Sequence, residues 1–294
     1  MEKLNDRRNF LGASEAAAVV GLSRYRTPFE VWLEKTGQAE NREETLAMRV
    51  GTALEPVVLG LFEEKTGMKV TDRQKQIVHP DHAFIRATLD GLIEGAVVEA
   101  KTTGSIEGWG EEGTDEVPME YIVQTQVQMA LTGYEIAFIP VLIGRSDFRI
   151  YRIKKDAELI SNIIKRAVSF WDLVQTLTPP TPTSLSDLAL AYPRDTGKIL
   201  IADQELEEAV LALAELKATI AEGEKRSEEL EAFIKSFLKD YSVLSSQDGR
   251  QLCSWKTQKS SRFDQKTFQI HHPQIFNQYK KESETRVFRL KKGE

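Results

Sequence analysis

The sequence contains a single cysteine, Cys253, and only four histidines in 294 residues. One thiol excludes a disulfide framework, a four-cysteine iron–sulfur cluster and a cysteine-based zinc site. The longest nearly apolar run, residues 136–143, is interrupted by Pro140 and is far shorter than a membrane span. The opening sequence, MEKLNDRRNF, lacks the apolar stretch of a signal peptide. We therefore expect a soluble, cytoplasmic protein without a thiol-based metal site.

Positive charge is also scarce overall, because 39 Lys and Arg face 45 Asp and Glu, for a formal net charge of −6. Nucleic-acid-binding domains usually carry a basic surplus, so the total alone argues against such a partner. The distribution is uneven: residues 181–245 hold 7 basic and 13 acidic side chains, whereas residues 246–294 hold 11 basic and 5 acidic ones. This asymmetry indicates either a basic interaction surface at the carboxyl end or an ordinary solvated surface.

Prolines concentrate in one short segment, residues 179–183, which forbids helix there and favours an extended connector. The connector separates residues 1–178 from an accessory region, residues 184–294. Both parts have the length of a domain.

The accessory region combines helix with a basic tail. Apolar residues at a 3-4 spacing predict helix over 203–241, either one long helix or an antiparallel helical hairpin bending near Gly223. A basic α/β tail, residues 243–294, follows. Its turn signals predict a β-hairpin over 243–255, and its apolar residues predict a final strand over 286–290.

Helical and extended patterns alternate in residues 1–178. Ser14 precedes an alanine-rich stretch and predicts a helix N-cap. Further helices are expected at 29–35, 46–66, 119–132 and 156–174, and strands at 75–79, 83–89, 96–101, 136–143 and 148–153. This order predicts an α/β sandwich built around a mixed sheet.

The strongest chemical signal is the combination of Asp90, Glu99 and Lys101. Glu99 and Lys101 lie two residues apart on a predicted strand, so they project from the same face. The pairs Asp90-Gly91 and Glu94-Gly95 are turn signals. A tight turn after Asp90 would bring a second carboxylate beside Glu99, and two close carboxylates favour an oxygen-ligated Mg²⁺ between them. Lys101 is placed to orient or deprotonate water, or to neutralise charge on a phosphate. The pattern suits phosphodiester hydrolysis, yet ordinary surface hairpins carry the same spacing.

Two neighbouring patterns add to this signal. Glu55 is the lone acid on the apolar side of the predicted helix 46–66, where a carboxylate is costly without a partner or metal. Tyr121, Gln124 and Gln128 share one face of the predicted helix 119–132 by their i, i+3 and i+7 spacing. Neutral amides suit holding a water or phosphate beside a metal. The alternatives are a glutamate at the edge of the apolar stripe and an exposed polar stripe.

Five ordered segments resemble the phage-type alkaline exonucleases, namely the YqaJ viral recombinase family and its relative lambda exonuclease. The matching segments are residues 10–37, 51–56, 87–91, 98–101 and 121–126. This resemblance implies the PD-(D/E)xK, restriction-endonuclease-like fold, a mixed sheet flanked by helices, with the nuclease core in residues 1–178. Leu89 stands where the family signature has its first proline, and the acid that follows it is kept.

The resemblance also implies roles for individual residues. Asp90 and Glu99 would hold the metal with the carbonyl of Ala100, and Glu55 would complete the site through the metal or its water. Lys101 would be the catalytic lysine.

The family further implies residues that bind the substrate. Tyr121 and Gln124 would position substrate or water, and Ser14 would contact the 5′-phosphate of DNA. An upstream arginine would assist Ser14, and both Arg7 and Arg8 are candidates for this role.

By this resemblance the chain is a Mg²⁺-dependent deoxyribonuclease, with Mn²⁺ as a substitute. It would degrade double-stranded DNA from 5′ to 3′ and leave a 3′ single strand for phage recombination. The expected partners are duplex ends, a single-strand annealing protein and further copies in a ring trimer. The setting would be the cytoplasm of a bacterial host, with a phage or prophage origin. A restriction- or repair-type endonuclease and a catalytically idle DNA-binding or assembly module remain alternatives.

Overall fold

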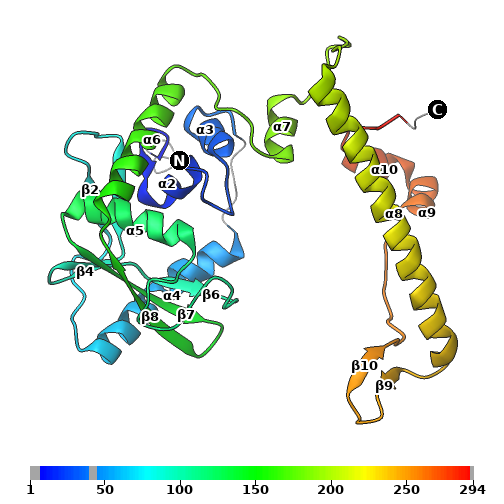
Figure 1. The fold of residues 1–294 in the computed structure, drawn as a ribbon, viewed down its shortest axis with the longest axis horizontal. Helices are drawn as coiled ribbons and strands as arrows, with labels where there is room; N and C mark the ends of the chain where they lie inside the picture. The colour runs from blue at the N-terminus through cyan, green and yellow to red at the C-terminus, as the bar shows by residue number, and fades with distance from the viewer. Residues whose placement is uncertain (1–6, 40–44, 292–294) are drawn as a thin grey trace. The chain divides into compact units, whose positions relative to one another are not determined.

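A computed structural model describes residues 7–39 and 45–291, which form two compact units, residues 1–191 and 192–294 (Figure 1). The first unit contains the mixed sheet and most of the buried side chains. The expected mixed α/β architecture of the amino-terminal part is therefore confirmed.

The main sheet of the first unit has five strands. They are β4 (Gly91–Ile93), β5 (Ala96–Val98), β6 (Lys101–Thr103), β7 (Ile136–Ile143) and β8 (Asp147–Lys154). Strand β4 pairs antiparallel with β5, and β8 pairs antiparallel with β7, while β5 and β6 both run parallel to β7. Ala96 pairs with Ile136 and Lys101 with Val141, the same offset of 40 residues (136 − 96 and 141 − 101). Strands β5 and β6 thus form one extended segment that pairs with β7 in a single register and is interrupted at Glu99 and Ala100.

A second, three-stranded sheet lies in the same unit. It consists of β1 (Leu11–Gly12), β2 (Lys75–Val78) and β3 (Ile85–Leu89), in the order β1-β3-β2. Strand β1 runs parallel to β3, and β2 runs antiparallel to it. Because β3 ends at Leu89 and β4 begins at Gly91, Asp90 lies where the chain passes from one sheet to the other.

Helices surround these sheets, and their ends follow local sequence signals. They are α2 (Ala13–Val19), α3 (Pro28–Lys35), α4 (Leu46–Thr66), α5 (Met119–Thr132), α6 (Ala157–Gln175) and α7 (Leu185–Ala191). The side chains of Thr27, Thr45 and Asp156 accept hydrogen bonds from the first turns of α3, α4 and α6. Gly133 ends α5 with a φ of 75°, in the left-handed region that glycine adopts without a Cβ clash.

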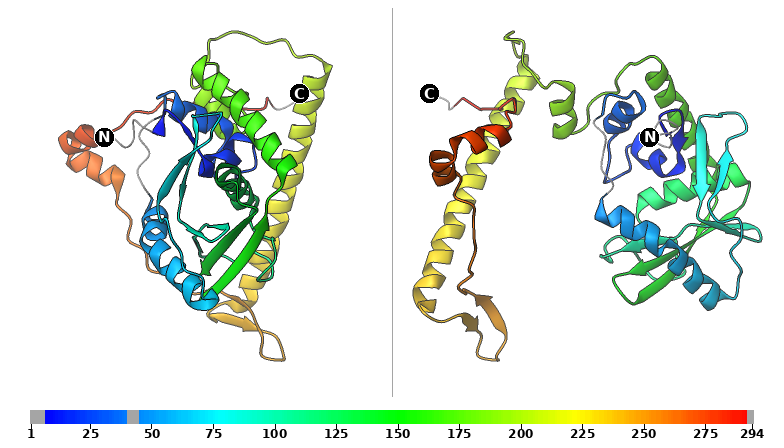
Figure 2. Two further views of the ribbon diagram at one scale, coloured as in Figure 1. Left: turned by 90° about the vertical axis from the view of Figure 1, so that its left-hand side faces the viewer. Right: turned by 180° about the vertical axis from the view of Figure 1, so that it is seen from behind.

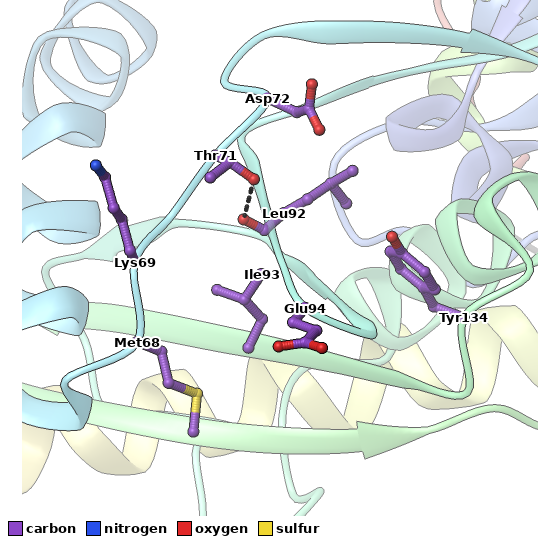
Figure 3. A pocket seen from close by; sticks show the side chains of 8 residues that line it. All are labelled: Met68, Lys69, Thr71, Asp72, Leu92, Ile93, Glu94 and Tyr134. Carbon is purple, nitrogen blue, oxygen red and sulfur yellow. Dashed lines mark hydrogen bonds between the residues drawn. The ribbon is translucent and has the colours of Figure 1, made fainter.

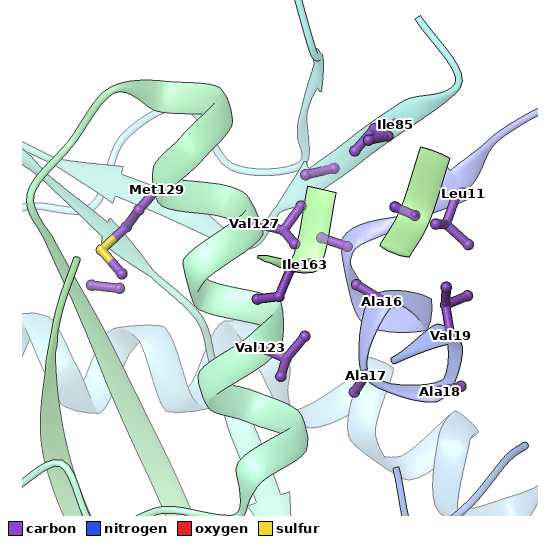
Figure 4. Packing of buried hydrophobic residues seen from close by; sticks show 14 of the residues in the cluster. Leu11, Ala16, Ala17, Ala18, Val19, Ile85, Val123, Val127, Met129 and Ile163 are labelled. Carbon is purple, nitrogen blue, oxygen red and sulfur yellow. The ribbon is translucent and has the colours of Figure 1, made fainter. Parts of the chain in front are cut away.

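The buried residues form two clusters on opposite faces of the main sheet. Ala137, Ile139 and Val141 of β7 belong to the larger cluster, with α2, α5 and α6 (Figure 4). Phe138, which alternates with them, packs in the smaller cluster with Leu59 and Phe62 of α4. The path of α4 along the first unit can be followed in the ribbon (Figure 2). This alternation is the period-2 pattern of a strand covered on both faces, so the core is a sandwich of helices around the sheet.

Helix α4 buries fewer apolar residues than its sequence period predicts. Val58, Leu59 and Phe62 are buried, whereas Leu46, Met48, Val50 and Val57 are 44% to 71% exposed. The predicted apolar face is therefore correct only for the carboxyl-terminal half of the helix. In the amino-terminal half, apolar residues lie on a side that no other described residue of the first unit, in 7–39 or 45–191, covers.

The residues that follow the prolines are held against the first unit. Asp187 of α7 is buried, and its carboxylate accepts hydrogen bonds from Thr27 Oγ1 at 2.7 Å and from the Thr183 backbone N–H at 2.9 Å. Burial raises the pKa of the Asp187 carboxyl, but these and neighbouring hydrogen bonds outweigh it and keep the pKa below its usual value. Along the chain, the boundary between the two compact units lies after α7. The functional boundary expected at residues 179–183 stays a prediction.

The second unit consists of one long helix with short flanking elements. They are α8 (Gln204–Leu238), β9 (Val243–Ser245), β10 (Gln251–Ser254), α9 (Gln265–His271) and α10 (Pro273–Tyr279). Helix α8 passes through Gly223 without a break, and β9 and β10 form the expected hairpin. The expected strand at 286–290 is wrong, because these residues have no regular secondary structure. Leu238 is the one buried residue of this unit within its described range, 192–291.

No helix in the described part of the chain is both long enough and apolar enough to span a membrane.

Candidate active site

The β4–β5 hairpin brings Asp90 and Glu99 together. Gly91 pairs with Val98, so the antiparallel register continues to Asp90 opposite Glu99. The Asp90 carboxylate accepts a hydrogen bond from the Ala100 backbone N–H at 2.9 Å. The predicted proximity of the two acids agrees with this register, and of the two predicted turn signals it is Glu94-Gly95 that closes the hairpin. The hairpin turns at residues 94–95, and Asp90 precedes the first strand of the hairpin.

Glu99 is buried, at 3% exposure, and polar groups surround its carboxylate. Its Oε1 accepts hydrogen bonds from Lys101 Nζ and from Gln124 Nε2, both at 2.6 Å. Its Oε2 accepts one from Gln128 Nε2, also at 2.6 Å. Gln124 Oε1 in turn accepts a hydrogen bond from Lys101 Nζ at 3.1 Å. The amide face predicted for helix α5 therefore points at the acidic strand and not at solvent.

Asp90 carries a large electrostatic perturbation. Burial raises the pKa of its carboxyl, and repulsion from Glu99 and Glu55 raises it further. The charge of Lys101 and the Ala100 hydrogen bond oppose this shift only in part, and the resulting pKa is about 8. The cluster therefore holds more negative charge than its single ammonium group neutralises.

Lys101 is a cation in this environment. Burial lowers the pKa of its ammonium group, but the charges of Glu99 and Asp90 together outweigh burial and raise the pKa above its usual value. Its Nζ also lies 4.8 Å from the centre of the Tyr121 ring, a cation–π distance. Of the roles considered from the sequence, this charge state favours neutralisation of a phosphate over abstraction of a proton.

Tyr121 lies between the acidic cluster and two further aromatic side chains, Trp109 and Tyr151. Its ring centre is 5.5 Å from that of Trp109, which in turn contacts Tyr151 at 5.2 Å. Burial raises the pKa of the Tyr121 hydroxyl, which therefore keeps its proton and can donate a hydrogen bond.

Glu55 lies on α4, half-buried and close enough to Asp90 to raise the pKa of the aspartate. Its Oε1 accepts a hydrogen bond from Gln74 Nε2 at 2.6 Å. The helix thus brings a third carboxylate toward the hairpin, while its side chain is held by a neighbouring amide.

Sequence reasoning missed two residues beside Tyr121. Arg24 Nε pairs with Glu120 at 2.7 Å, and the Tyr25 hydroxyl interacts with the Tyr121 hydroxyl. Tyr25 is 62% exposed although it is a large aromatic residue. The available signal was a cationic and aromatic cluster, Ser23 to Arg26, between two short helices.

The structure corrects the expected helix cap at Ser14. Gly12 is the N-cap of α2, and Ser14 lies inside the first turn with an exposed side chain. The Gly12 backbone N–H donates to Glu15 Oε2 at 2.8 Å, so the helix starts two residues earlier than predicted. Glu15 is itself paired with Lys35 Nζ at 2.7 Å, and this lysine side chain is fully buried.

The two candidate arginines lie at the start of the described chain. Arg7 is exposed, and its backbone carbonyl accepts a hydrogen bond from Lys35 Nζ at 2.8 Å. Arg8 is half-buried, with its guanidinium against Gly37.

The donor set of the acidic cluster fits a hard cation. Across residues 7–39 and 45–291, no three His, Cys, Asp or Glu side chains already converge on a common point. Burial and then repulsion from Glu99 and Glu55 nevertheless raise the pKa of Asp90, and a cation between these carboxylates would favour its charged form. Gln128 Oε1 is also buried and has no hydrogen-bond donor in the part of the chain that is described. Carboxylate, carbonyl and amide oxygens are the ligands that suit Mg²⁺.

A surface pocket elsewhere in the first unit does not mark this chemistry. It is bounded by the segment after α4 and by strand β4 (Figure 3), and its lining residues are Met68, Lys69, Thr71, Asp72, Leu92, Ile93, Glu94 and Tyr134. None of the residues of the acidic cluster lines it.

Known structures share the fold of much of this chain. The crystal structure of the alkaline exonuclease LHK-Exo from Laribacter hongkongensis is 26% identical, with a TM-score of 0.51, and the match covers 60% of this chain and 94% of that chain. The structure of LHK-Exo in complex with dAMP matches with 25% identity, a TM-score of 0.50 and the same coverage. Nearly the whole exonuclease is thus matched by about three fifths of this chain.

Sequence comparison gives a longer match. A family model described as the YqaJ-like viral recombinase domain matches residues 3–135, a range that includes every candidate site residue. The protein YqaJ of Bacillus subtilis (strain 168) is 34% identical over 306 residues, which cover 99% of this chain and 93% of that protein. The resemblance inferred from the sequence is confirmed, and the chain belongs to the YqaJ-like viral recombinase family.

Proposed function

We propose that this chain is a Mg²⁺-dependent exonuclease that degrades double-stranded DNA from 5′ to 3′ and leaves a 3′ single strand. The observation that carries the proposal is the convergence of Asp90, Glu99 and Lys101 with the amides of α5. A pair of close acids beside a half-buried lysine is costly unless a ligand uses it. The similarity to an alkaline exonuclease supports the same reaction class.

Asp90 and Glu99 would hold the metal through their carboxylates, with the carbonyl of Ala100 and, directly or through water, Glu55. Mn²⁺ would substitute for Mg²⁺, because both accept oxygen ligands. The bound ion would activate a water and polarise the scissile phosphate.

The protein side chains would orient the substrate and balance its charge. The Lys101 ammonium would neutralise negative charge developing on the phosphate, while Glu99 and Gln124 fix its position by hydrogen bonds of 2.6 Å and 3.1 Å. Tyr121 would donate a hydrogen bond to substrate or water from a hydroxyl that stays protonated. Gln124 adds a neutral amide that holds Glu99 without adding charge.

The 5′ polarity of the reaction would depend on the amino-terminal segment. Ser14, exposed in the first turn of α2, would contact the terminal phosphate together with Arg7 or Arg8. Exposed Arg7 suits this role better than half-buried Arg8, because a flexible surface guanidinium reaches an incoming phosphate without moving neighbours.

The remaining parts of the proposal concern partners and setting. The chain would act on duplex ends, with a single-strand annealing protein, as a homo-oligomer such as a ring trimer. It would work in the cytoplasm of a bacterial host during phage-type recombination. The exposed apolar positions along α8 offer a surface for assembly or for the annealing partner.

The decisive experiment digests a linear, 5′-phosphorylated duplex in Mg²⁺ with the wild-type chain and with Lys101→Ala. We expect the variant to lose about 2.7 kcal/mol or more of transition-state stabilisation, which is 100-fold in rate. Lys154→Ala removes an exposed lysine from strand β8 and is the matched control. Equal digestion by all three proteins, or none by wild type, would reject the assigned site.

Two further substrates define the reaction class. Removing the 5′-phosphate from the duplex should slow digestion by the wild-type chain. The same change should slow a Ser14→Ala variant by a smaller factor. A covalently closed circle should remain intact. Nicking of that circle would instead indicate the endonuclease alternative.

A further inference from the structure

The segment that joins β10 to α9 is extended and exposed. Residues 255–264 have no regular secondary structure and link the hairpin to the short helix (Figure 1). Two aromatic residues lie at the ends of this segment, one at its first position and one at its last but one. Trp255 is 46% exposed and Phe263 is 71% exposed, so neither ring belongs to a core.

Cations lie between and beside the two rings. The segment with the first turn of α9 contains four exposed basic side chains, Lys256, Lys259, Arg262 and Lys266. None of them forms an ion pair with any of the described residues, 7–39 and 45–291. Their charge is therefore available to an external anion.

The single acid of the segment is already engaged. Asp264 is the N-cap of α9, where its Oδ1 accepts from the Thr267 backbone N–H at 3.0 Å and its Oδ2 from Thr267 Oγ1 at 2.6 Å. Its carboxylate therefore faces the helix end, and the four cations keep a local surplus of positive charge.

Local contacts hold both rings in place without covering them. The Trp255 backbone N–H donates to the Ser242 carbonyl at 2.9 Å, and Lys235 Nζ lies 5.3 Å from the Trp255 ring centre. The Phe263 ring centre lies 4.8 Å from that of Phe268. Tethered rings lose less conformational entropy on binding than free ones, so they suit stacking with a planar ligand.

We propose that residues 255–266 are a binding site for single-stranded DNA. Bases would stack on Trp255 and Phe263, and the cations between them would contact the phosphates. A duplex fits this arrangement poorly, because its base faces are already stacked on one another. The assignment of the ligand rests on the proposed function, since digestion of one strand of a duplex leaves the other strand single.

Tryptophan fluorescence gives a local test, because Trp255 differs from the other tryptophans. The others are buried, with exposures of 4% to 9%: Trp32, Trp109 and Trp171. Oligo(dT) of about 20 nucleotides, longer than most single-strand sites of this kind, is added to the full chain in EDTA, where hydrolysis is stopped. We expect quenching of the exposed fluorophore. Absence of quenching at low salt would overturn the proposal.

Fluorescence anisotropy of a labelled oligo(dT) then measures affinity. Trp255→Ala should weaken binding about 5-fold to 100-fold, the loss of one stacked base, while Trp255→Phe should retain most of the affinity. A Lys256→Gln, Lys259→Gln, Arg262→Gln chain should lower the slope of log affinity against log salt by about 2, since each single-strand phosphate contact contributes about 0.7.

A charge-matched control removes three cations elsewhere in the same unit, in a Lys281→Gln, Arg289→Gln, Lys291→Gln chain. An equal loss of affinity in this control would show that only net charge matters and would refute the site. Tighter binding of duplex DNA than of oligo(dT) would refute the single-strand assignment. Binding of an acidic peptide without binding of oligo(dT) would refute it as well.

The result is separable from the proposed nuclease activity. Lys101→Ala, which tests the nuclease site, should show the same quenching of Trp255 as wild type, because this fluorophore reports on residues 255–266. A chain that binds the oligonucleotide but cleaves nothing refutes the proposed function alone, whereas a chain that cleaves without quenching refutes the binding site alone.

Discussion

Replacing Asp90 by asparagine should stabilise the metal-free protein. The aspartate is held near two other carboxylates and its pKa is raised to about 8, so its charged form is unfavourable in the folded state. Asparagine has almost the same shape, and its side-chain oxygen can still accept the hydrogen bond from the Ala100 backbone N–H. The substitution therefore removes the unfavourable charge and leaves the local geometry in place.

The raised pKa sets the size of this effect. One pKa unit corresponds to about 1.4 kcal/mol. At pH 7 the unfolded carboxyl, with a pKa near 4, is about three units above its pKa, whereas the folded carboxyl is still protonated. The resulting loss of stability has an upper limit of about 4 kcal/mol. Asp90 is only half-buried, and water relaxes part of the penalty. We expect Asp90→Asn to raise the unfolding free energy by about 2 kcal/mol, which raises Tm by about 4 to 8 °C for a unit of this size.

The pH dependence has a definite sign. The carboxyl ionises near pH 4 in the unfolded chain and near pH 8 in the folded one. Between these values the folded state binds one more proton, so wild-type stability falls as the pH rises from about 4 to 8 and then levels off. The advantage of Asp90→Asn should therefore be absent at pH 4, grow through this window and reach its maximum above pH 8.

Thermal unfolding in EDTA, followed by tryptophan fluorescence, measures this effect. Three of the four tryptophans lie buried in the first unit and report its unfolding. Glu94→Gln, an exposed change in the same hairpin, is the control and should leave Tm unchanged. Mg²⁺ at 100 times its dissociation constant should stabilise wild type by about 2.7 kcal/mol and Asp90→Asn far less. A destabilised variant in EDTA, or equal stabilisation of both chains by Mg²⁺, would refute the reasoning.

Two further substitutions test the packing around the site. Gly91→Ala would place a Cβ 2.1 Å from Val70 Cγ1, so we expect a loss of about 1 to 3 kcal/mol by urea unfolding; adding Val70→Ala should restore part of it, and a lack of rescue would show that the clash is not the cause. Lys35→Met removes a fully buried ammonium that pairs with Glu15 at 2.7 Å, and should cost about 3 kcal/mol because the carboxylate loses its nearest counter-charge and keeps only Arg26, at 3.7 Å. Adding Glu15→Gln should recover part of this loss, and strictly additive effects would contradict the pairing.

The composition of the site was predictable because its signals are local. The spacing between Asp90, Glu99 and Lys101 spans one hairpin, and the positions of Gln124 and Gln128 span about one turn of one helix. A strand alternates its faces and a helix repeats every 3.6 residues, so such short patterns fix which side chains point together. The packing of α5 against the acidic strand is a tertiary contact between distant segments, which short patterns do not predict. The family resemblance indicated this contact.

The errors concern competition between signals of similar strength. Ser14 is a good N-cap by residue type, but Glu15 satisfies the Gly12 backbone N–H first and moves the helix start. Of the two predicted turn signals, Glu94-Gly95 closes the hairpin, whereas at Asp90-Gly91 the chain passes from β3 to β4. In both cases residue type alone indicated more than one position for the same local structure. The choice between them depended on side-chain hydrogen bonds and strand pairing that a short window of sequence does not contain.

The net charge of −6 is a poor guide to a nucleic-acid partner in this chain. At physiological salt, charges separated by more than about 8 Å are largely screened, so a ligand responds to the charges near it and not to the total. The acidic surplus lies partly around Asp90, where a divalent cation would offset it, and partly along α8. The unpaired cations of residues 255–266 lie outside both groups. An acidic protein can therefore present a cationic surface to DNA, and weak backbone contacts would let an exonuclease advance along its substrate without being trapped.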